Sequence, residues 1–153
     1  MSPTTYDWIR ASASMPLVSK VVELEGMKVL DGGVADSIPL EYFESIGYER
    51  NLVILTQPHG YVKEHNKLMP LMRIALREYP NMIEAMDKRH LMYNKQLSYV
   101  YQAESAGRAL VIRPEGQLPI GHISHDPEEM QRVYDIGRAT GMKYIERIKA
   151  FFR

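Results

Sequence analysis

The sequence contains no cysteine and no excess of charge of either sign. Its 153 residues include 19 Lys and Arg against 19 Asp and Glu, which gives a formal net charge of zero. Without cysteine the chain forms no disulfide framework, no thiol nucleophile and no Cys-ligated zinc site. Nucleic-acid binders need a basic surface that displaces counterions from phosphates, so the balanced charge argues against a nucleic-acid partner. The lack of cysteine fits a reducing compartment, and we expect a cytoplasmic protein.

Long apolar runs are also missing. No stretch approaches the roughly 18–20 apolar residues that a membrane helix needs. The first ten residues, MSPTTYDWIR, have neither the basic flank nor the apolar segment of a signal peptide. With 45% hydrophobic and 25% charged residues, the composition is that of an ordinary globular domain. We therefore expect residues 1–153 to form a single domain without a transmembrane segment.

Two short apolar runs predict buried strands. Residues 52–55 and 109–112 are continuously apolar, which is typical of strands covered on both faces in parallel sheets. Residues 21–24 and 27–30 flank Glu25-Gly26 and predict a hairpin. We also take residues 27–30 as a third strand of the core sheet.

Helices are predicted between and after these strands, near residues 4–13, 40–46, 66–79 and 81–105, and from Asp126-Pro127 to the C-terminus. Strands alternating with helices indicate an α/β fold, a short mostly parallel sheet flanked by helices. The segment 66–79 is apolar on nearly every side. A sheet of so few strands leaves part of this apolar surface uncovered, so the fold looks incomplete. We expect either missing sequence or another copy of the chain to cover it.

One segment, Leu30-Asp31-Gly32-Gly33-Val34, has the features of a functional site. The acid follows the end of an apolar strand, where open α/β sheets bind their ligands. The glycines allow a sharp turn and the close approach of another segment. A carboxylate held there could serve as a general base. Asp-Gly is also a common turn sequence, so the residues alone leave both interpretations open.

The surroundings of this triplet resemble the patatin-like phospholipase family. The resemblance rests on Ala11-Ser12-Ala13-Ser14-Met15-Pro16, a short hairpin, the Asp-Gly-Gly triplet, Ala35-Asp36-Ser37-Ile38-Pro39 and Leu55-Thr56-Gln57-Pro58. It implies the C-terminal part of a patatin-like fold and a serine lipid acyl hydrolase with a Ser–Asp dyad. In that dyad Asp31 would activate the serine directly, without a histidine, a metal or a cofactor. The implied substrate is a lipid or another carboxylic ester.

The nucleophile of that dyad is missing from the sequence. Gly-x-Ser-x-Gly does not occur, and neither does the glycine-rich oxyanion loop. Because both precede the Asp motif in the family, we expect this chain to be a C-terminal portion that supplies Asp31 and is inactive alone. Gly32 and Gly33 would let Asp31 approach the serine, and Ser14 would shape the adjacent loop. His59 follows the 52–55 strand and is a candidate for lining the pocket, with a simple loop turn as the alternative.

Two other functions remain open. A non-catalytic α/β interaction module would self-associate or dock a partner through the apolar helix over 66–79. A metal hydrolase would use His122 and His125, which lie three residues apart beside Asp126. Zinc needs three or four ligands with supporting contacts, so we predict a solvated loop and no metal there.

Overall fold

The computed structural model describes residues 4–121 and 124–153. It confirms the α/β fold class, with short strands flanked by helices. The chain divides into two compact units. Unit 1 contains the residues up to Pro39 and Lys63–Gln96, and unit 2 contains Leu40–Val62 and Leu97–Arg153. The single domain expected over residues 1–153 stays a prediction.

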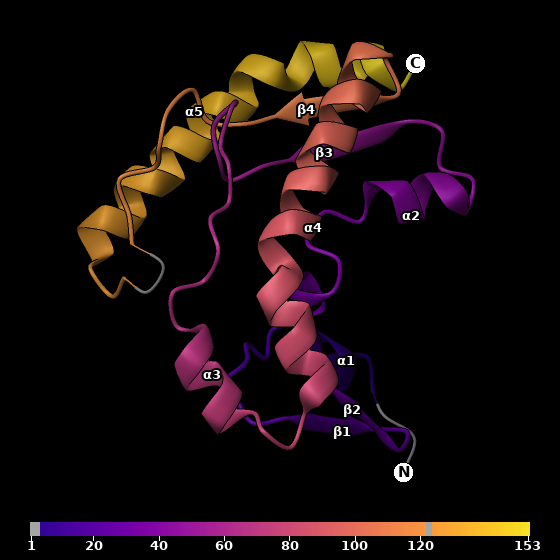
Figure 1. Cartoon of the computed structure of the whole chain (residues 1–153). Coiled ribbons are helices and arrows are strands. Elements are labelled where there is room, and N and C mark those ends of the chain that lie inside the picture. Colours follow the sequence, from indigo (N-terminus) through magenta and orange to yellow (C-terminus); the bar gives the residue numbers. More distant parts are fainter. Residues whose placement is uncertain (1–3, 122–123) are drawn as a thin grey trace. The chain divides into compact units, whose positions relative to one another are not determined.

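Unit 1 combines a hairpin with helices. Its elements are α1 (Thr5–Ser12), β1 (Val22–Leu24), β2 (Met27–Val29), the 3-10 turn η1 (Gly32–Val34), α3 (Met69–Ala75) and the first part of α4 (Pro80–Ser105) (Figure 1). Helix α1 begins where the sequence predicts, because the Asp7 carboxylate accepts hydrogen bonds from the Thr4 amide at 3.0 Å and the Thr4 hydroxyl at 2.8 Å.

The predicted hairpin is confirmed, and its turn explains the register. Leu24 pairs with Met27, so the loop between the strands has only two residues. Glu25 and Gly26 both have positive φ angles, 50° and 76°, as a type I′ turn requires. The glycine adopts its angle without steric cost, whereas few other residues would. The strand that leads to Asp31 is therefore fixed in register by its turn.

Two apolar clusters form the core of unit 1. The larger one contains Val34, Met69, Met72, Leu76 and Met86 as buried members. The smaller one joins α1 to the hairpin through Ala11, Val22 and Leu24. Val34 follows the Asp-Gly-Gly triplet directly, so burial of its side chain anchors the turn to the larger cluster.

Unit 2 contains the parallel sheet. Its elements are α2 (Leu40–Ser45), β3 (Asn51–Ile54), the rest of α4, β4 (Ala109–Ile112) and α5 (Pro127–Phe151). Strands β3 and β4 pair in parallel, from Asn51 opposite Ala109 to Ile54 opposite Ile112, which confirms the predicted parallel pairing. All four residues of β4 are buried. In β3, however, the Ile54 side chain is 70% exposed.

Two details of the predicted fold are wrong. Strand β2 does not join the parallel sheet, because among the described residues it pairs only with β1. The helix predicted over 66–79 is confined to Met69–Ala75. Pro70 lies in its first turn, where a missing amide hydrogen costs nothing, and Tyr79 precedes Pro80, which disfavours helical backbone.

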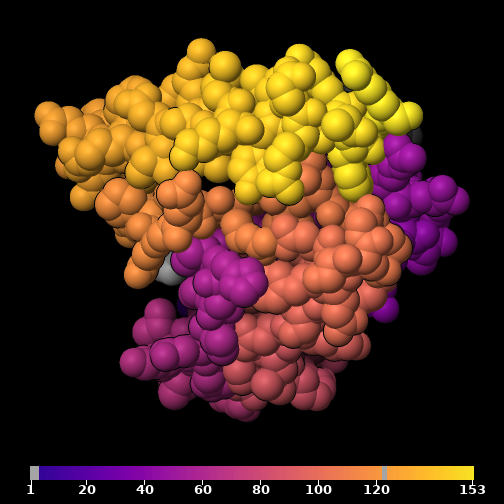
Figure 2. Space-filling model, turned by 90° about the horizontal axis from the view of Figure 1, so that it is seen from above, coloured from indigo at the N-terminus to yellow at the C-terminus, as the bar shows by residue number. Residues whose placement is uncertain are grey.

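Helix α5 lies on the surface. The side chain of Asp126 caps it by accepting hydrogen bonds from the amides of Glu128 and Glu129 at 2.8 and 3.4 Å, as the sequence predicts. None of its residues is buried, and Figure 2 shows it as the orange-to-yellow band open to solvent. None of the helices in the described part of the chain is long and apolar enough to cross a lipid bilayer.

Candidate functional site

Asp31 lies two residues beyond the end of β2 and caps the following 3-10 turn η1. Its side-chain Oδ1 accepts a hydrogen bond from the Gly33 amide at 2.8 Å. Its own amide donates to the Ser14 carbonyl oxygen at 2.8 Å. The other carboxylate oxygen, Oδ2, has no hydrogen-bond partner within residues 4–121 and 124–153. The half-buried carboxylate thus has one oxygen held by the turn and one without a hydrogen bond from the described residues.

Ser14 supports this turn through its backbone. Its side chain is buried, 5% exposed, and its hydroxyl donates to the Arg10 carbonyl oxygen at 2.7 Å near the end of α1. The hydroxyl is therefore engaged, and the Ser14 carbonyl oxygen accepts the hydrogen bond from the Asp31 amide. These contacts place Ser14 beside the turn, and its roles in shaping the loop and in substrate binding stay predictions.

The two glycines of the triplet differ in their surroundings. A Cβ atom on Gly33 would lie 3.1 Å from Asp31 Oδ1 and 3.8 Å from Arg89 Nη2. A Cβ atom on Gly32 would meet nothing within 4 Å. Neither residue has a φ angle in the left-handed region. Glycine at position 33 therefore matters for the close approach of the Asp31 carboxylate, and glycine at position 32 does not.

Helix α4 holds the segment that follows the triplet. Arg89 Nε donates to the Gly33 carbonyl oxygen at 2.9 Å, and the Ser37 hydroxyl donates to the same oxygen. Two helical turns further along, the Gln96 side chain accepts from the Ile38 amide at 3.1 Å and donates to Asp36. Positions 89 and 96 share one face of the helix. That face forms a clamp on residues 33–38.

A second cation, Lys63, lies near Arg89 beside α4. The Lys63 ammonium lies over the Tyr93 ring, 5.2 Å from its centroid, one helical turn beyond Arg89. Burial lowers the pKa of Lys63, and the charge of Arg89 lowers this pKa further. Arg89 forms no ion pair with a carboxylate in the part of the chain that the structure describes.

His59 lies in unit 2, whereas Ser14, Asp31, Gly32 and Gly33 lie together in unit 1. The His59 ring is exposed and stacks on Tyr101, with 4.8 Å between ring centroids. It follows β3 in the loop at the carboxyl end of that strand, as the sequence indicates. Its role in lining a pocket stays a prediction.

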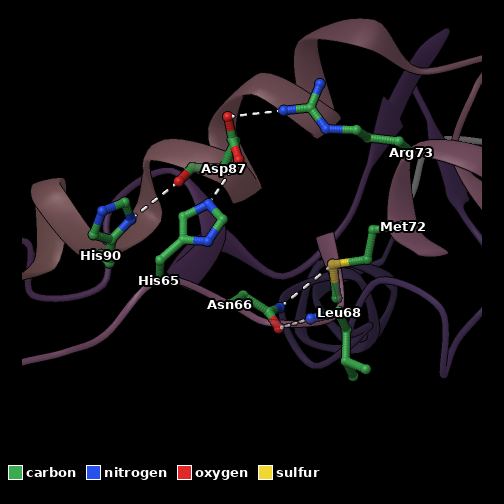
Figure 3. A network of polar contacts seen from close by, with 7 residues as sticks. All are labelled: His65, Asn66, Leu68, Met72, Arg73, Asp87 and His90. Atoms are coloured by element: carbon green, nitrogen blue, oxygen red, sulfur yellow. Dashed lines mark hydrogen bonds and ion pairs between the residues drawn. The ribbon is translucent and has the colours of Figure 1, made fainter. Parts of the chain in front are cut away.

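A second polar network in unit 1 connects α3 to α4 (Figure 3). The Asp87 carboxylate bonds His65 Nε2 at 2.8 Å and Arg73 at 3.0 Å. The hydrogen bond from His65, and after it the charge of Arg73, lowers the pKa of Asp87. His90 lies with its ring centroid 5.0 Å from that of His65 and bonds the Asp87 carbonyl oxygen at 3.0 Å.

This network does not amount to a metal centre. Among the described residues, no group of three or more His, Cys, Asp or Glu side chains is arranged to hold an ion. The Arg73 guanidinium already pairs with one oxygen of the Asp87 carboxylate, and its positive charge opposes binding of a metal cation. His122, the first histidine of the alternative metal site, lies outside the described residues.

Sequence reasoning did not find the α4 clamp. Arg89 and Gln96 belong to a predicted helix, but 56 residues separate Arg89 from Gly33 and 58 separate Gln96 from Ile38. Contacts over such distances leave no local pattern. The only signal was that Arg89 stands beside the apolar stripe of α4, where a long side chain can reach across a packed surface.

Two family models match this chain. The model of the patatin-like phospholipases matches residues 2–44, and the model of a domain of unknown function, DUF6363, matches residues 79–153. No curated protein matches the chain significantly. The resemblance to patatin-like phospholipases is thereby confirmed for the segment that contains α1, the hairpin and the Asp-Gly-Gly triplet. It is a partial match, and it connects the chain to a family of lipid hydrolases.

Proposed function

We propose that this chain is the acid-bearing part of a serine lipid acyl hydrolase with a Ser–Asp dyad. Asp31 is the general base, and the serine belongs to a polypeptide segment other than residues 1–153. The observation that carries the proposal is the Asp31 carboxylate itself, with Oδ1 bonded to the Gly33 amide and Oδ2 without a hydrogen-bond partner among the described residues. The match of residues 2–44 to the patatin-like phospholipases supports the same assignment.

The chemistry requires a base beside a hydroxyl. Asp31 Oδ2 accepts the serine proton as the serine oxygen attacks the ester carbonyl, and the proton then passes to the departing alcohol. In the second half-reaction water attacks the acyl-enzyme and gives up a proton to Asp31. Asp31 then passes this proton to the serine oxygen as the tetrahedral intermediate releases the carboxylic acid. The oxyanion of each tetrahedral intermediate needs preorganised amides, which the proposal assigns to the same segment as the serine.

Within this chain Ser14 is a poor nucleophile candidate. Its hydroxyl is buried and donates to the Arg10 carbonyl oxygen, so its proton is directed away from Asp31. We therefore expect the isolated chain to hydrolyse no p-nitrophenyl butyrate. Turnover by the chain alone that disappears in Asp31→Ala would show that it has its own serine nucleophile and would refute the division of the dyad.

The test of the dyad uses a complementary segment. Residues 1–153 are coexpressed with the segment of a patatin-like phospholipase that carries Gly-x-Ser-x-Gly, and ester hydrolysis is measured. We expect turnover that Asp31→Asn abolishes while the complex still copurifies. Glu23→Gln is the matched control, because Glu23 is an exposed acid on β1 of the same unit and lies outside the clamp. Turnover that survives Asp31→Asn would refute the proposal.

One observation favours a second candidate function, a non-catalytic module that self-associates. Leu68, Leu71 and Ile74 lie on one side of α3, and each is more than half exposed. A second copy of the chain covering this side would remove apolar surface from water. Sedimentation should then detect a dimer that Ile74→Lys dissociates, with Lys67→Gln as the control. A monomer at all concentrations would rule out this function.

A further inference from the structure

Gly33 is held at both of its backbone polar groups. Its amide donates to Asp31 Oδ1 at 2.8 Å, and its carbonyl oxygen accepts from Arg89 Nε at 2.9 Å and from the Ser37 hydroxyl. Rotation of this residue would break bonds at both ends. The orientation of the Asp31 carboxylate therefore depends on whatever holds the Gly33 carbonyl group.

The two donors to that carbonyl oxygen differ in what they fix. Ser37 lies four residues along the same segment, so its bond closes the turn locally. Arg89 comes from α4, a helix of 26 residues, and fixes the turn relative to a rigid element. The Ser37 bond is the shorter one, 2.5 Å against 2.9 Å, but the guanidinium of Arg89 is permanently charged, and a charged donor strengthens a hydrogen bond. Arg89 is therefore the donor that sets where the turn lies.

The surroundings of the Arg89 side chain suit this role. It is half-buried, and within the described part of the chain it pairs with no carboxylate that would draw it away. Its Nη2 and Asp31 Oδ1 approach Gly33 from the same side, at 3.8 and 3.1 Å from the position of a Cβ atom. Glycine at this position is what lets Asp31 Oδ1 come so close, whereas 3.8 Å is an ordinary contact distance for Arg89 Nη2.

We propose that Arg89 is the positioning residue for the Asp31 carboxylate: it holds the Gly33 carbonyl oxygen, and through Gly33 it keeps Asp31 Oδ1 bonded and Oδ2 free. The consequence of this positioning for catalysis rests on the proposed function. The positioning itself does not, because it concerns only contacts within unit 1.

The first experiment measures hydrogen exchange of the Gly33 amide by NMR in the isolated chain. Loss of this bond should raise the exchange rate at least ~5-fold in Arg89→Met, which keeps a long side chain but has no donor. Arg89→Gln should stay within ~2-fold of wild type, because its amide nitrogen occupies the position of Arg89 Nε along the side chain. Lys88→Gln is the control, because Lys88 is exposed and pairs with Glu84. Amides of β1 and β2 should not change. An unchanged Gly33 rate, or an equal rise at all amides, would overturn the proposal.

Should Arg89→Met not fold, Ser37→Ala provides a second variant. It leaves the Arg89 bond in place, so the Gly33 exchange rate should rise less than ~2-fold. A larger rise would assign the positioning role to Ser37 and refute the role of Arg89.

The second experiment uses the complex of the dyad test. Arg89→Met should lower kcat about 10-fold or more with KM unchanged, and Arg89→Gln, which keeps a donor at the position of Nε, should retain most of kcat. If hydrolysis is insensitive to Asp31→Asn while Gly33 exchange still responds to Arg89→Met, the proposed function fails and the positioning of the turn stands. If Asp31→Asn abolishes hydrolysis while Arg89→Met leaves kcat and Gly33 exchange unchanged, the positioning role fails alone.

Discussion

The contrast between Gly32 and Gly33 gives the sharpest test of the Asp31 site. A Cβ atom at position 33 would lie 3.1 Å from Asp31 Oδ1, closer than ordinary van der Waals contact. Either the carboxylate or the backbone must move by a few tenths of an ångström. Both movements weaken the 2.8 Å hydrogen bond between Oδ1 and the Gly33 amide. Gly33→Ala should therefore destabilise the protein, and Gly32→Ala should not.

The magnitude follows from the bond that is lost. A hydrogen bond to a charged group contributes about 1.5–3 kcal/mol, and partial exposure of Asp31 reduces the loss to about 1–2 kcal/mol because water replaces some of it. Alanine restricts the unfolded chain and returns about 0.4–1 kcal/mol, so the net destabilisation of Gly33→Ala is about 1 kcal/mol. For a chain of this length that lowers Tm by about 2–4 °C. Gly32→Ala retains only the gain, so its Tm should stay level or rise slightly.

Thermal denaturation followed by circular dichroism measures both values under identical conditions. The NMR signal of the amide at position 33 should shift in Gly33→Ala, beyond the change of residue type, and that of Ala35 should not. Equal Tm values for the two variants, with the amide at position 33 still hydrogen-bonded, would show that Gly33 is not required for the approach of Asp31.

Three further predictions concern the scaffold. Asp126→Ala should lower stability by about 0.5–2 kcal/mol through loss of the α5 cap, and Asp126→Asn, itself a good cap, should not; equal thermal midpoints would contradict this. Met69→Ala, at a side chain only 2% exposed, should cost about 2–5 kcal/mol in urea unfolding, and a smaller change would mean that the core refills the space. The lowered pKa of Asp87 implies a stabilising contribution that is present above its ordinary value of 3.8 and lost as the pH falls through the folded-state value. Asp87→Asn should thus make urea midpoints less dependent on acid pH, and an unchanged dependence would exclude Asp87 as its source.

Local signals in the sequence predicted most of the elements. The two-residue turn at Glu25-Gly26 and the cap at Asp126 depend on backbone angles and side chains close in sequence, and both are confirmed. The parallel pairing of β3 and β4 was predicted from their continuous apolar character. These features are readable because the chemistry that specifies them lies within a few residues.

The errors arose where a local pattern had more than one structural solution. Residues 27–30 are compatible with a hairpin strand and with a central strand, and apolar content alone does not choose between them. The exposed Ile54 likewise differs from the burial that its neighbours predict. In the segment 66–79 the apolar side chains masked the signals from Pro70 and Pro80 that limit the helix. Burial depends on which other segments are present, and the sequence of one segment does not contain that information.

Part of the segment that matches the domain of unknown function contacts the turn that follows Asp31. Residues 79–153 match that family model and residues 2–44 match the patatin-like model, yet Arg89 and Gln96 bond directly to residues 33–38. The larger apolar cluster also contains residues of both segments, because Val34 and Met86 are buried in it together. Under the proposed function, variation at Arg89 or Gln96 changes how Asp31 works without altering the Asp-Gly-Gly triplet, because the geometry of a base is set by the groups that orient it. The limits of a family match are thus not the limits of the structure that holds this turn.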